Sequence, residues 1–200
     1  MTISKGVDWG RHLALPEGTP VLASDSAAAD VIARGASLQV GLIGGDLCKT
    51  LGGNADPARL RAEGATEVPI DVGVLRVDGG APRMFVAHVV ARRRAWQGSF
   101  VVVANVQWLG RWKVAPRAHP NDGQLDILEG ALSVTDRVKA RRRATSGGHL
   151  PHPGLRMRRT SAAEFIFERG LHVWVDGKHI GRGRHLEVSI RPDFALCVVG

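Results

Sequence analysis

Tyrosine is absent from the 200 residues, and only 5% of them are aromatic. So few aromatic side chains give little support to a stacking platform for single-stranded nucleic acid. The two cysteines, Cys48 and Cys197, lie far apart and match no metal-binding spacing, so they are expected to be reduced, buried thiols. No apolar run approaches the roughly 18 residues of a membrane-spanning helix. The first 12 residues also lack the apolar centre of a signal peptide, which predicts a cytoplasmic protein.

Basic residues exceed acidic ones, 27 to 19, which gives a formal net charge of +8. A surface of this kind attracts phosphates or anionic lipid headgroups, so a lipid or a peripheral membrane site is one expected partner. A solvated basic face that binds nothing is the alternative. Nucleic acid is the least expected partner. The excess is clustered in four arginine-rich stretches, at residues 92–94, 141–143, 156–159 and 182–184.

The pattern of apolar residues changes near residue 66. Before it, residues 20–23 and 38–43 favour strands, while residues 26–34 and 46–52 favour helices that begin near Ser24 or Asp25 and after Gly44-Gly45. After it, most segments alternate as strands do, with one helix over residues 134–144 whose Leu132, Val134 and Val138 are expected to face inward. The prediction is an α+β protein, with a truncated α/β portion at 1–66 and an antiparallel β-sandwich at 67–200.

The predicted strands of the second part cover residues 67–77, 83–91, 100–106, 124–128, 164–168, 171–175, 185–190 and 194–199. Asp78-Gly79-Gly80 joins the first two as a hairpin turn. Residues 145–154 form the clearest loop.

Two stretches carry a family resemblance. Residues 100–129 contain Val103-Ala104-Asn105, then Gly110, then Lys113-Val114-Ala115-Pro116 and Asp122-Gly123-Gln124-Leu125-Asp126, and a later turn reads Val175-Asp176-Gly177-Lys178. This order resembles the second domain of the diacylglycerol kinase and sphingosine kinase family, which belongs to the NAD kinase type of superfamily. The resemblance covers about the last two thirds of the chain. It implies that a complete, active member would use ATP and Mg²⁺ to phosphorylate a lipid hydroxyl. The family's G-G-D-G-T nucleotide loop does not occur as a string in this chain.

Residues 41–52 are similar to a second glycine-rich signature of the family, in which a strand ends in G-T-G-N-D before a helix. The resemblance places Gly44, Gly45 and Asp46 at the cofactor phosphates, because glycines before a helix let backbone amides approach an anion. An aspartate in the first turn would repel phosphate unless a metal lay between them. The alternative is an ordinary strand-to-helix turn capped by Asp46.

The resemblance also implies a metal site at Asp122, beside the carbonyls of His119 and Gln124. Mixed oxygen ligands of this kind suit Mg²⁺. Asp-Gly is equally a common tight-turn pair, so a simple turn remains the alternative.

Asp176 is the expected catalytic base, since phosphoryl transfer to an alcohol needs a carboxylate that accepts the hydroxyl proton. The family's D-G-E turn reads Asp176-Gly177-Lys178 here, so a cation replaces the second carboxylate. Lys178 would pair with Asp176 or bind a phosphate. The alternative is a hairpin turn without catalysis. The histidines, His149 and His152 among them, have no spacing typical of a zinc site.

Two functions follow from these observations. The first is a non-catalytic, pseudoenzyme-like module that binds a lipid or a complete kinase; the second is an active lipid kinase whose nucleotide loop is supplied elsewhere. Because a shortened sheet leaves an unpaired edge, we also expect a homodimer that buries residues from 18–66.

Overall fold

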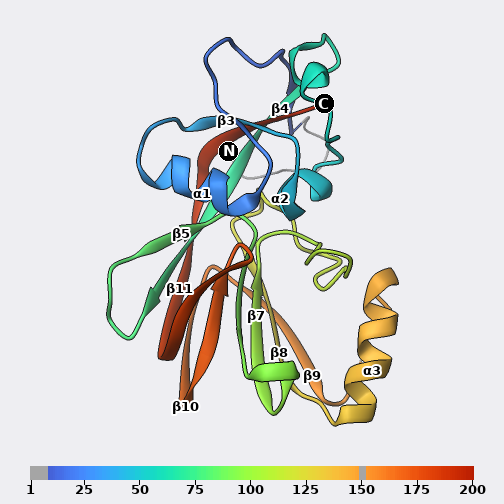
Figure 1. The fold of residues 1–200 in the computed structure, drawn as a ribbon, viewed down its shortest axis with the longest axis vertical. Coiled ribbons are helices and arrows are strands. Elements are labelled where there is room, and N and C mark those ends of the chain that lie inside the picture. The colour runs from blue at the N-terminus through green and yellow to red at the C-terminus, as the bar shows by residue number, and fades with distance from the viewer. Residues whose placement is uncertain (1–8, 149–151) are drawn as a thin grey trace.

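The computed structural model describes residues 9–148 and 152–200, which form a small α/β portion above a larger β-sandwich (Figure 1). Both the mixed α+β class and the mainly antiparallel second part are as predicted. His149 lies outside the described residues. The helices are α1 (Asp25–Ala33), α2 (Gly45–Thr50) and α3 (Val134–Arg143), with 3-10 turns η1 (Pro57–Arg61), η2 (Arg94–Trp96) and η3 (Ala144–Ser146). The strands are β1 (Arg11–His12), β2 (Val21–Leu22), β3 (Gln39–Leu42), β4 (Thr66–Val77), β5 (Arg83–Phe85), β6 (His88–Arg92), β7 (Ser99–Ala104), β8 (Leu125–Ala131), β9 (Leu155–Thr160), β10 (Ala162–Val175) and β11 (Lys178–Val199).

The α/β portion forms where its sequence signals predict it. Ser24 caps α1, because its hydroxyl oxygen accepts the Ala27 N–H at 3.3 Å. The helix buries its alanine-rich side and Ile32 against the sheet, and Gly35 follows it at a φ of 66°, a conformation that glycine adopts without strain. Strands β2 and β3 are parallel, and β3 is in turn parallel to β11. The first part of the chain therefore extends the sheet of the second part, although the division at residue 66 stays a prediction.

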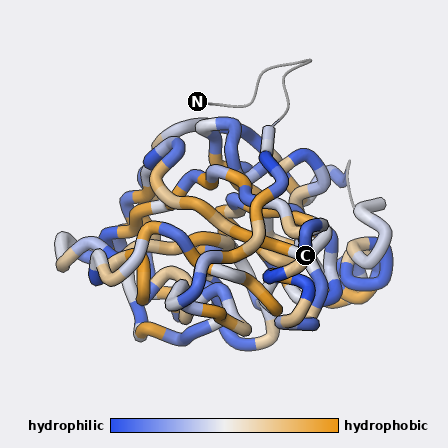
Figure 2. Tube along the Cα trace, turned by 90° about the horizontal axis from the view of Figure 1, so that it is seen from above, coloured by the Kyte–Doolittle hydropathy of each residue, from blue (hydrophilic) through white to orange (hydrophobic). Residues whose placement is uncertain are grey.

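The remaining strand pairs are antiparallel and lie in one sheet that folds over on itself. The strand order is β1-β4-β11-β10-β6-β7-β8-β9. The register of β10 against β11 shifts between Ile166 and Leu171, and such irregularities increase the local twist and curvature of a sheet. Side chains from both halves, such as Leu75, Leu186, Val103 and Ile127, meet in one core between the two layers. Figure 2 shows the hydrophobic strands inside and hydrophilic segments around them.

The prediction of one return strand over residues 83–91 is wrong in one respect, because the segment forms two strands, β5 and β6. Strand β5 pairs with β4, whereas β6 pairs with β7 and β10 in the other layer. The chain crosses between the layers at Val86 and Ala87. At that crossing the backbone N–H groups donate to the carboxylate of Asp176 and not to a strand. A side chain distant in sequence therefore interrupts a segment whose local pattern is continuous.

Two further expectations are corrected. Strand β9 was not predicted, although Leu155 and Met157 alternate with Arg156 and Arg158 as a strand facing a hydrophobic surface requires. Helix α3 has the predicted span, but Val134 and Val138 do not face inward: they are 68% and 50% exposed. Among the described residues, no helix is long and apolar enough to cross a membrane.

Candidate functional site

Asp176 lies in the tight turn between β10 and β11, at a φ of 47°. Its Oδ1 accepts the N–H groups of Ala87 and His88 at 2.9 and 2.8 Å, and its Oδ2 accepts that of Val86 at 2.9 Å. Burial, together with the nearby Asp25, raises the pKa of Asp176 to about 7, although the three N–H donors act to lower it. The residue thus lies in a hairpin turn, and its carboxylate anchors the crossover between the two layers, whereas its catalytic role stays a prediction.

Asp25 was not predicted as a site residue. It is the first residue of α1, and its buried carboxylate lies at the N-terminus of α2. Its Oδ2 accepts the Asp46 N–H at 2.6 Å and its Oδ1 accepts the Leu47 N–H at 3.0 Å. Burial raises its pKa to about 6. The N-terminus of α2 is thus capped by Asp25, and the expected cap by Asp46 is wrong. The available signal was an acidic residue between a short strand and a helix.

Gly45 is required by this arrangement. A Cβ at this position would lie 2.4 Å from Oδ1 of Asp25, and the residue has a φ of 94°. The preceding Gly44 is extended, and a Cβ there would lie 2.5 Å from the carbonyl oxygen of Ala23. Both glycines therefore allow the end of β2 to approach the start of α2 closely.

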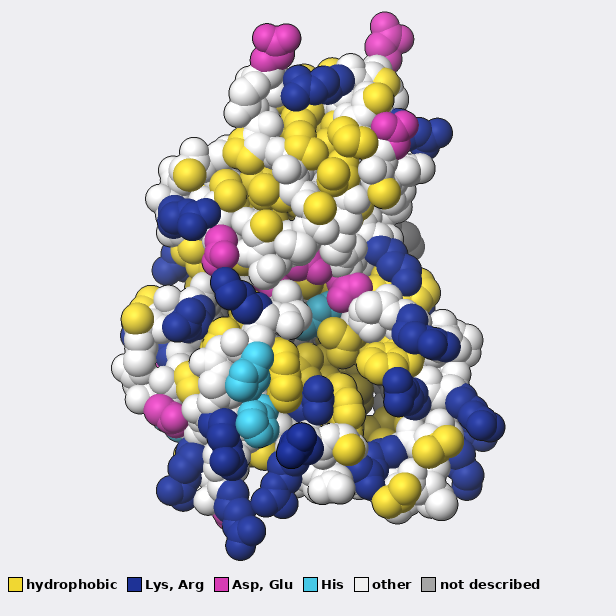
Figure 3. All heavy atoms as spheres, viewed as in Figure 1, with side chains coloured by type: hydrophobic (Ala, Val, Ile, Leu, Met, Phe, Trp, Pro, Cys, Tyr) yellow, Lys and Arg dark blue, Asp and Glu magenta, His cyan; other side chains and the backbone are white. Residues whose placement is uncertain are grey.

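Asp46 faces the second part of the molecule. Its Oδ1 accepts the Gly110 N–H at 2.8 Å, and its Oδ2 lies 3.8 Å from Nδ1 of the buried His88. Burial lowers the pKa of His88 to about 3, so this imidazole is neutral at pH 7 and the contact is not an ion pair. Burial also raises the pKa of Asp46. Acidic side chains and a histidine are visible together at the middle of the face in Figure 3.

These contacts do not fit a phosphate at the Gly44-Gly45 turn. A helix N-terminus binds an anion through free N–H groups, but the N–H groups of Asp46 and Leu47 already donate to a carboxylate. An incoming phosphate would also meet the carboxylates of Asp25 and Asp46. The described residues contain no cluster of three or more histidine, cysteine or acidic side chains placed as metal ligands.

Lys178 does not turn toward Asp176. Its Nζ lies 3.7 Å from a carboxylate oxygen of Asp30 on α1, and both side chains are more than half exposed. The two residues line a hollow of about 360 Å³ between α1 and the strands. Asp176, Arg83 and Arg191 also line it. The cation that replaces the family's second carboxylate thus connects the β10–β11 turn to α1.

Asn105, the last residue of the V-A-N motif, holds the crossover from the other side. Its Nδ2 donates to the carbonyl oxygens of Asp71 and Val86 at 2.9 and 3.0 Å, and its backbone N–H donates to Ala87 at 2.9 Å. The side chain is fully buried. The motif therefore has a structural role here, because it joins β4, the crossover and the end of β7.

The predicted metal ligands lie in a different network. The Asp122 carboxylate contacts the Arg159 guanidinium, and its Oδ1 accepts the Gln124 N–H at 3.0 Å, as in a simple turn. Nδ1 of His119 accepts the Asn121 N–H at 3.2 Å, and its ring packs against Trp9. Within residues 9–148 and 152–200, no hydrogen bond or ion pair joins Asp122 to Asp176. The magnesium role of Asp122, His119 and Gln124 stays a prediction.

Two buried acids stabilise the D-G-x-x-D segment. Asp71 accepts the N–H groups of Gly123 and Asp193 at 2.7 and 2.9 Å, and burial raises its pKa. Asp126 lies 3.4 Å from the Arg159 guanidinium, and burial raises its pKa to about 6. Sequence reasoning missed Asp71, because an acid inside an alternating strand gives no signal of its distant partners.

The outer face of strands β6 to β9 carries a partly exposed apolar surface, which we call the aromatic face. A recess floored by hydrophobic side chains lies between α3 and the strands, with Lys and Arg on both sides (Figure 3). Nε1 of Trp112 is buried and has no hydrogen-bond partner among the described residues. Basic groups stack on its rings: Arg92 lies 4.1 Å from Trp174, and Arg141 lies 5.1 Å from Trp112. The partly buried members are Trp96, Leu109, Trp112, Leu132, Leu155, Met157 and Trp174.

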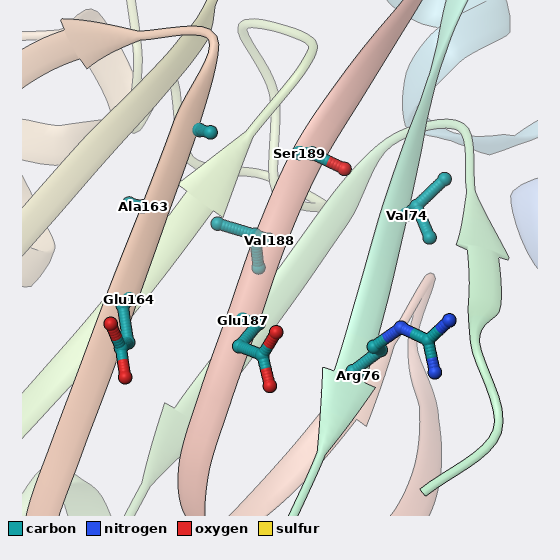
Figure 4. A pocket seen from close by; sticks show the side chains of 8 residues that line it. Val74, Arg76, Ala163, Glu164, Glu187, Val188 and Ser189 are labelled. Carbon is teal, nitrogen blue, oxygen red and sulfur yellow. The ribbon is translucent and has the colours of Figure 1, made fainter. Parts of the chain in front are cut away.

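A second hollow lies on the opposite layer, over β4, β11 and β10. Glu164 and Glu187 are register partners there, and Arg76 lies on the next strand (Figure 4). None of the predicted site residues lines this hollow. His172 and His179 form a separate exposed pair with their ring nitrogens 3.1 Å apart.

Comparisons with known proteins agree with this architecture. Two solved structures from Bacillus anthracis str. Sterne are similar to the chain. One, described as a "putative diacylglycerol kinase", shares 14% identity at a TM-score of 0.61, over 81% of this chain and 70% of that one. The other, a diacylglycerol kinase, shares 15% identity at a TM-score of 0.56, over 81% and 67%. At these identities the likeness shows the fold. No curated protein matches the chain.

The model of the YegS C-terminal NAD kinase beta sandwich-like domain matches residues 70–199. This range includes the crossover, the V-A-N and D-G-x-x-D segments, the aromatic face and the Asp176 turn. The chain therefore belongs to this family and has the fold of a diacylglycerol kinase-like C-terminal domain.

Proposed function

We propose that this protein is a non-catalytic lipid-binding module that holds the acyl part of a lipid on the aromatic face. The observation that supports this most is the composition of that surface. Seven apolar side chains, three of them tryptophans, remain partly exposed in one cluster. Monomeric proteins rarely expose contiguous apolar surface of this kind, and where it occurs it usually marks a binding site.

The border of the aromatic face suits an anionic headgroup. Lys49 lies 3.7 Å from the ring of Trp108, and Lys113 lies 5.8 Å from the same ring. Arg92 and Arg141 stack on Trp174 and Trp112, which belong to the aromatic face. An amphiphile with a long apolar part and a phosphate or carboxylate head would match both the apolar floor and the basic border.

The contacts at the Gly44-Gly45 turn favour binding over catalysis. The N–H groups that would cradle a phosphate are occupied by Asp25, and Asp176 is used to hold three backbone N–H groups. Lys178 stands where the family has its second carboxylate, and it pairs with Asp30.

Quenching of tryptophan fluorescence by a phosphatidic acid with brominated acyl chains tests the proposal. We expect quenching that saturates with lipid in the wild type and is lost in Met157→Glu, which places a charge on the aromatic face. The matched control is Ile166→Glu, because Ile166 is a β10 residue that is 78% exposed and not part of the aromatic face. Equal quenching in all three proteins, or none in the wild type, would refute lipid binding at this surface.

A second candidate is a lipid kinase, and one observation favours it. Burial raises the pKa of Asp176 to about 7, the range in which a carboxylate accepts a proton effectively near neutral pH. Incubation with ATP, Mg²⁺ and diacylglycerol would then give phosphatidic acid above a matched blank, and Asp176→Asn would abolish the product. No product from the wild type leaves the binding module as the function.

A further inference from the structure

Helix α3 is oriented with its polar side toward the protein. Asp136, Arg137 and Ala140 are half-buried, whereas Val134 and Val138 are 68% and 50% exposed. Residues four apart lie on one side of a helix, so the two valines form a stripe that faces solvent. A surface helix normally does the reverse and turns its apolar stripe to the core.

Polar contacts fix this orientation. Nη1 of Arg137 donates to the carbonyl oxygen of Ala95 at 2.5 Å, and Arg141 lies over the ring of Trp112. The Lys113 N–H donates to the carbonyl oxygen of Ala144 just after the helix, at 2.7 Å. The helix is thus held at both ends while its valines contribute nothing to the core.

The exposed side of α3 is basic as well as apolar. Lys139, Arg142 and Arg143 are exposed beside the valine stripe. The helix has one acid, Asp136, which is half-buried and accepts a hydrogen bond from the Ser133 hydroxyl at 2.7 Å. Arg93 and Arg94 are exposed next to Ala95, so the basic surface continues onto the β6–β7 connection.

We propose that this surface, formed by α3 and the Arg93-Arg94 turn, docks on an anionic lipid bilayer. An apolar stripe flanked by lysine and arginine is the pattern of a helix that lies in the plane of the headgroups. Valines enter the boundary of the acyl region, and the cations contact lipid phosphates. The helix cations are the charge complement of such a membrane.

The shape of the surface favours a bilayer over a peptide. Helix α3 stands out from the side of the sandwich (Figure 1), and its exposed valines line neither the hollow beside α1 nor the hollow over β4, β10 and β11. A projecting helix fits a flat partner better than an extended chain, which needs a groove. The proposal goes beyond lipid binding by the aromatic face, because docking requires no lipid to leave the bilayer.

Sedimentation with vesicles tests the proposal. One set contains phosphatidylcholine alone, and the other also contains phosphatidylglycerol. We expect the wild type to bind only the anionic vesicles. Removing three charges in Lys139→Gln/Arg142→Gln/Arg143→Gln should weaken binding on the order of 100-fold, and Val134→Ser/Val138→Ser should weaken it on the order of tenfold.

The matched control removes three exposed arginines far from α3, in Arg34→Gln/Arg59→Gln/Arg61→Gln. It should bind as the wild type does, to within a few fold. Equal losses in the two charge variants would mean that net charge alone drives binding and would overturn the proposal. The proposal would also be overturned if the wild type did not bind anionic vesicles. That result is expected if the partner of α3 is not a membrane.

Two controls keep the outcomes separate. Circular dichroism and thermal melting show whether the α3 variants remain folded, and α3 has no buried residue whose loss should unfold the protein. Quenching by a dispersed short-chain brominated phosphatidic acid reports the aromatic face in the same variants. Retained quenching with lost vesicle binding supports docking through α3, whereas vesicle binding without quenching leaves docking intact and refutes the proposed function.

Discussion

Single carboxylates hold together segments that are distant in sequence. Asp176 fixes the point where the chain passes from one sheet layer to the other, Asp25 caps a helix that begins 20 residues later, and Asp71 binds the D-G-x-x-D segment. Each is buried or half-buried and accepts backbone N–H groups. A carboxylate in such a position stabilises structure through charge-assisted hydrogen bonds, whatever chemistry it also performs.

Replacing Asp176 by alanine should destabilise the fold strongly. Three backbone N–H groups lose their acceptor, so we expect the free energy of unfolding to fall by about 3 kcal/mol or more. Urea denaturation measures the change. Asp30→Ala is the control, because its carboxylate is exposed and pairs with an exposed lysine, and it should cost less than about 1 kcal/mol. Equal effects would contradict the structural role of Asp176.

The pKa values predict how stability depends on pH. Because the folded state holds the proton of Asp176 up to about pH 7, while an unfolded aspartate releases it near its ordinary pKa of 3.8, this group stabilises the fold at low pH. Its contribution is lost as pH rises through about 4 to 7. His88, with a pKa lowered to about 3, acts in the opposite direction between about pH 3 and 6.5.

The difference between wild type and Asp176→Asn isolates the Asp176 contribution, because His88 is common to both proteins. The stability of the wild type relative to the variant should decrease from about pH 4 to about pH 7 and stay constant above. Denaturation at a series of pH values gives this difference. A difference that increases with pH would show that the pKa of Asp176 is not raised.

At the scale of elements, α2 depends on a cap that another element supplies. Asp25→Ala should cost about 2 kcal/mol or more and should accelerate amide hydrogen exchange over residues 45–50, since the Asp46 and Leu47 N–H groups lose their acceptor. Ser24→Ala is the matched control, because Ser24 caps α1 and not α2. Faster exchange confined to α1 in both variants would contradict the assignment.

Local sequence patterns predicted most elements and failed where distant contacts decide. Helix α1 has its cap, Ser24, and a glycine stop beside it in the sequence, and α2 begins after Gly44 and is followed by Gly52, so their spans were predictable. The break between β5 and β6 is made by Asp176, about 90 residues away, and leaves no local trace. The valines of α3 follow a helical period, but polar anchors on the other side reverse the orientation that this period implies.

The candidate site shows the same division. The turn at Asp176 and the glycines at 44–45 were recognised from their strings. Asp25 and His88 were missed, because their proximity to Asp46 exists only after β2, α2 and β6 have packed together.

At the scale of the whole molecule, we expect a homodimer that buries part of residues 18–66. In the part of the chain that the structure describes, β2 pairs only with β3 and is two residues long, and Leu38 is 50% exposed nearby. Light scattering at micromolar concentration should give twice the chain mass of 21.4 kDa. Leu38→Glu should shift the protein toward the monomer, and a wild-type monomer would remove the inference.

The aromatic face, the basic groups along its border and the outward α3 all lie on one side of the molecule (Figure 3), which is the arrangement expected of a protein that meets lipid. Native mass spectrometry of freshly purified protein tests this most directly. The account predicts a bound lipid on the wild type and on Ile166→Glu, and none on Met157→Glu. A wild type without lipid, or lipid retained equally by Met157→Glu, would contradict it.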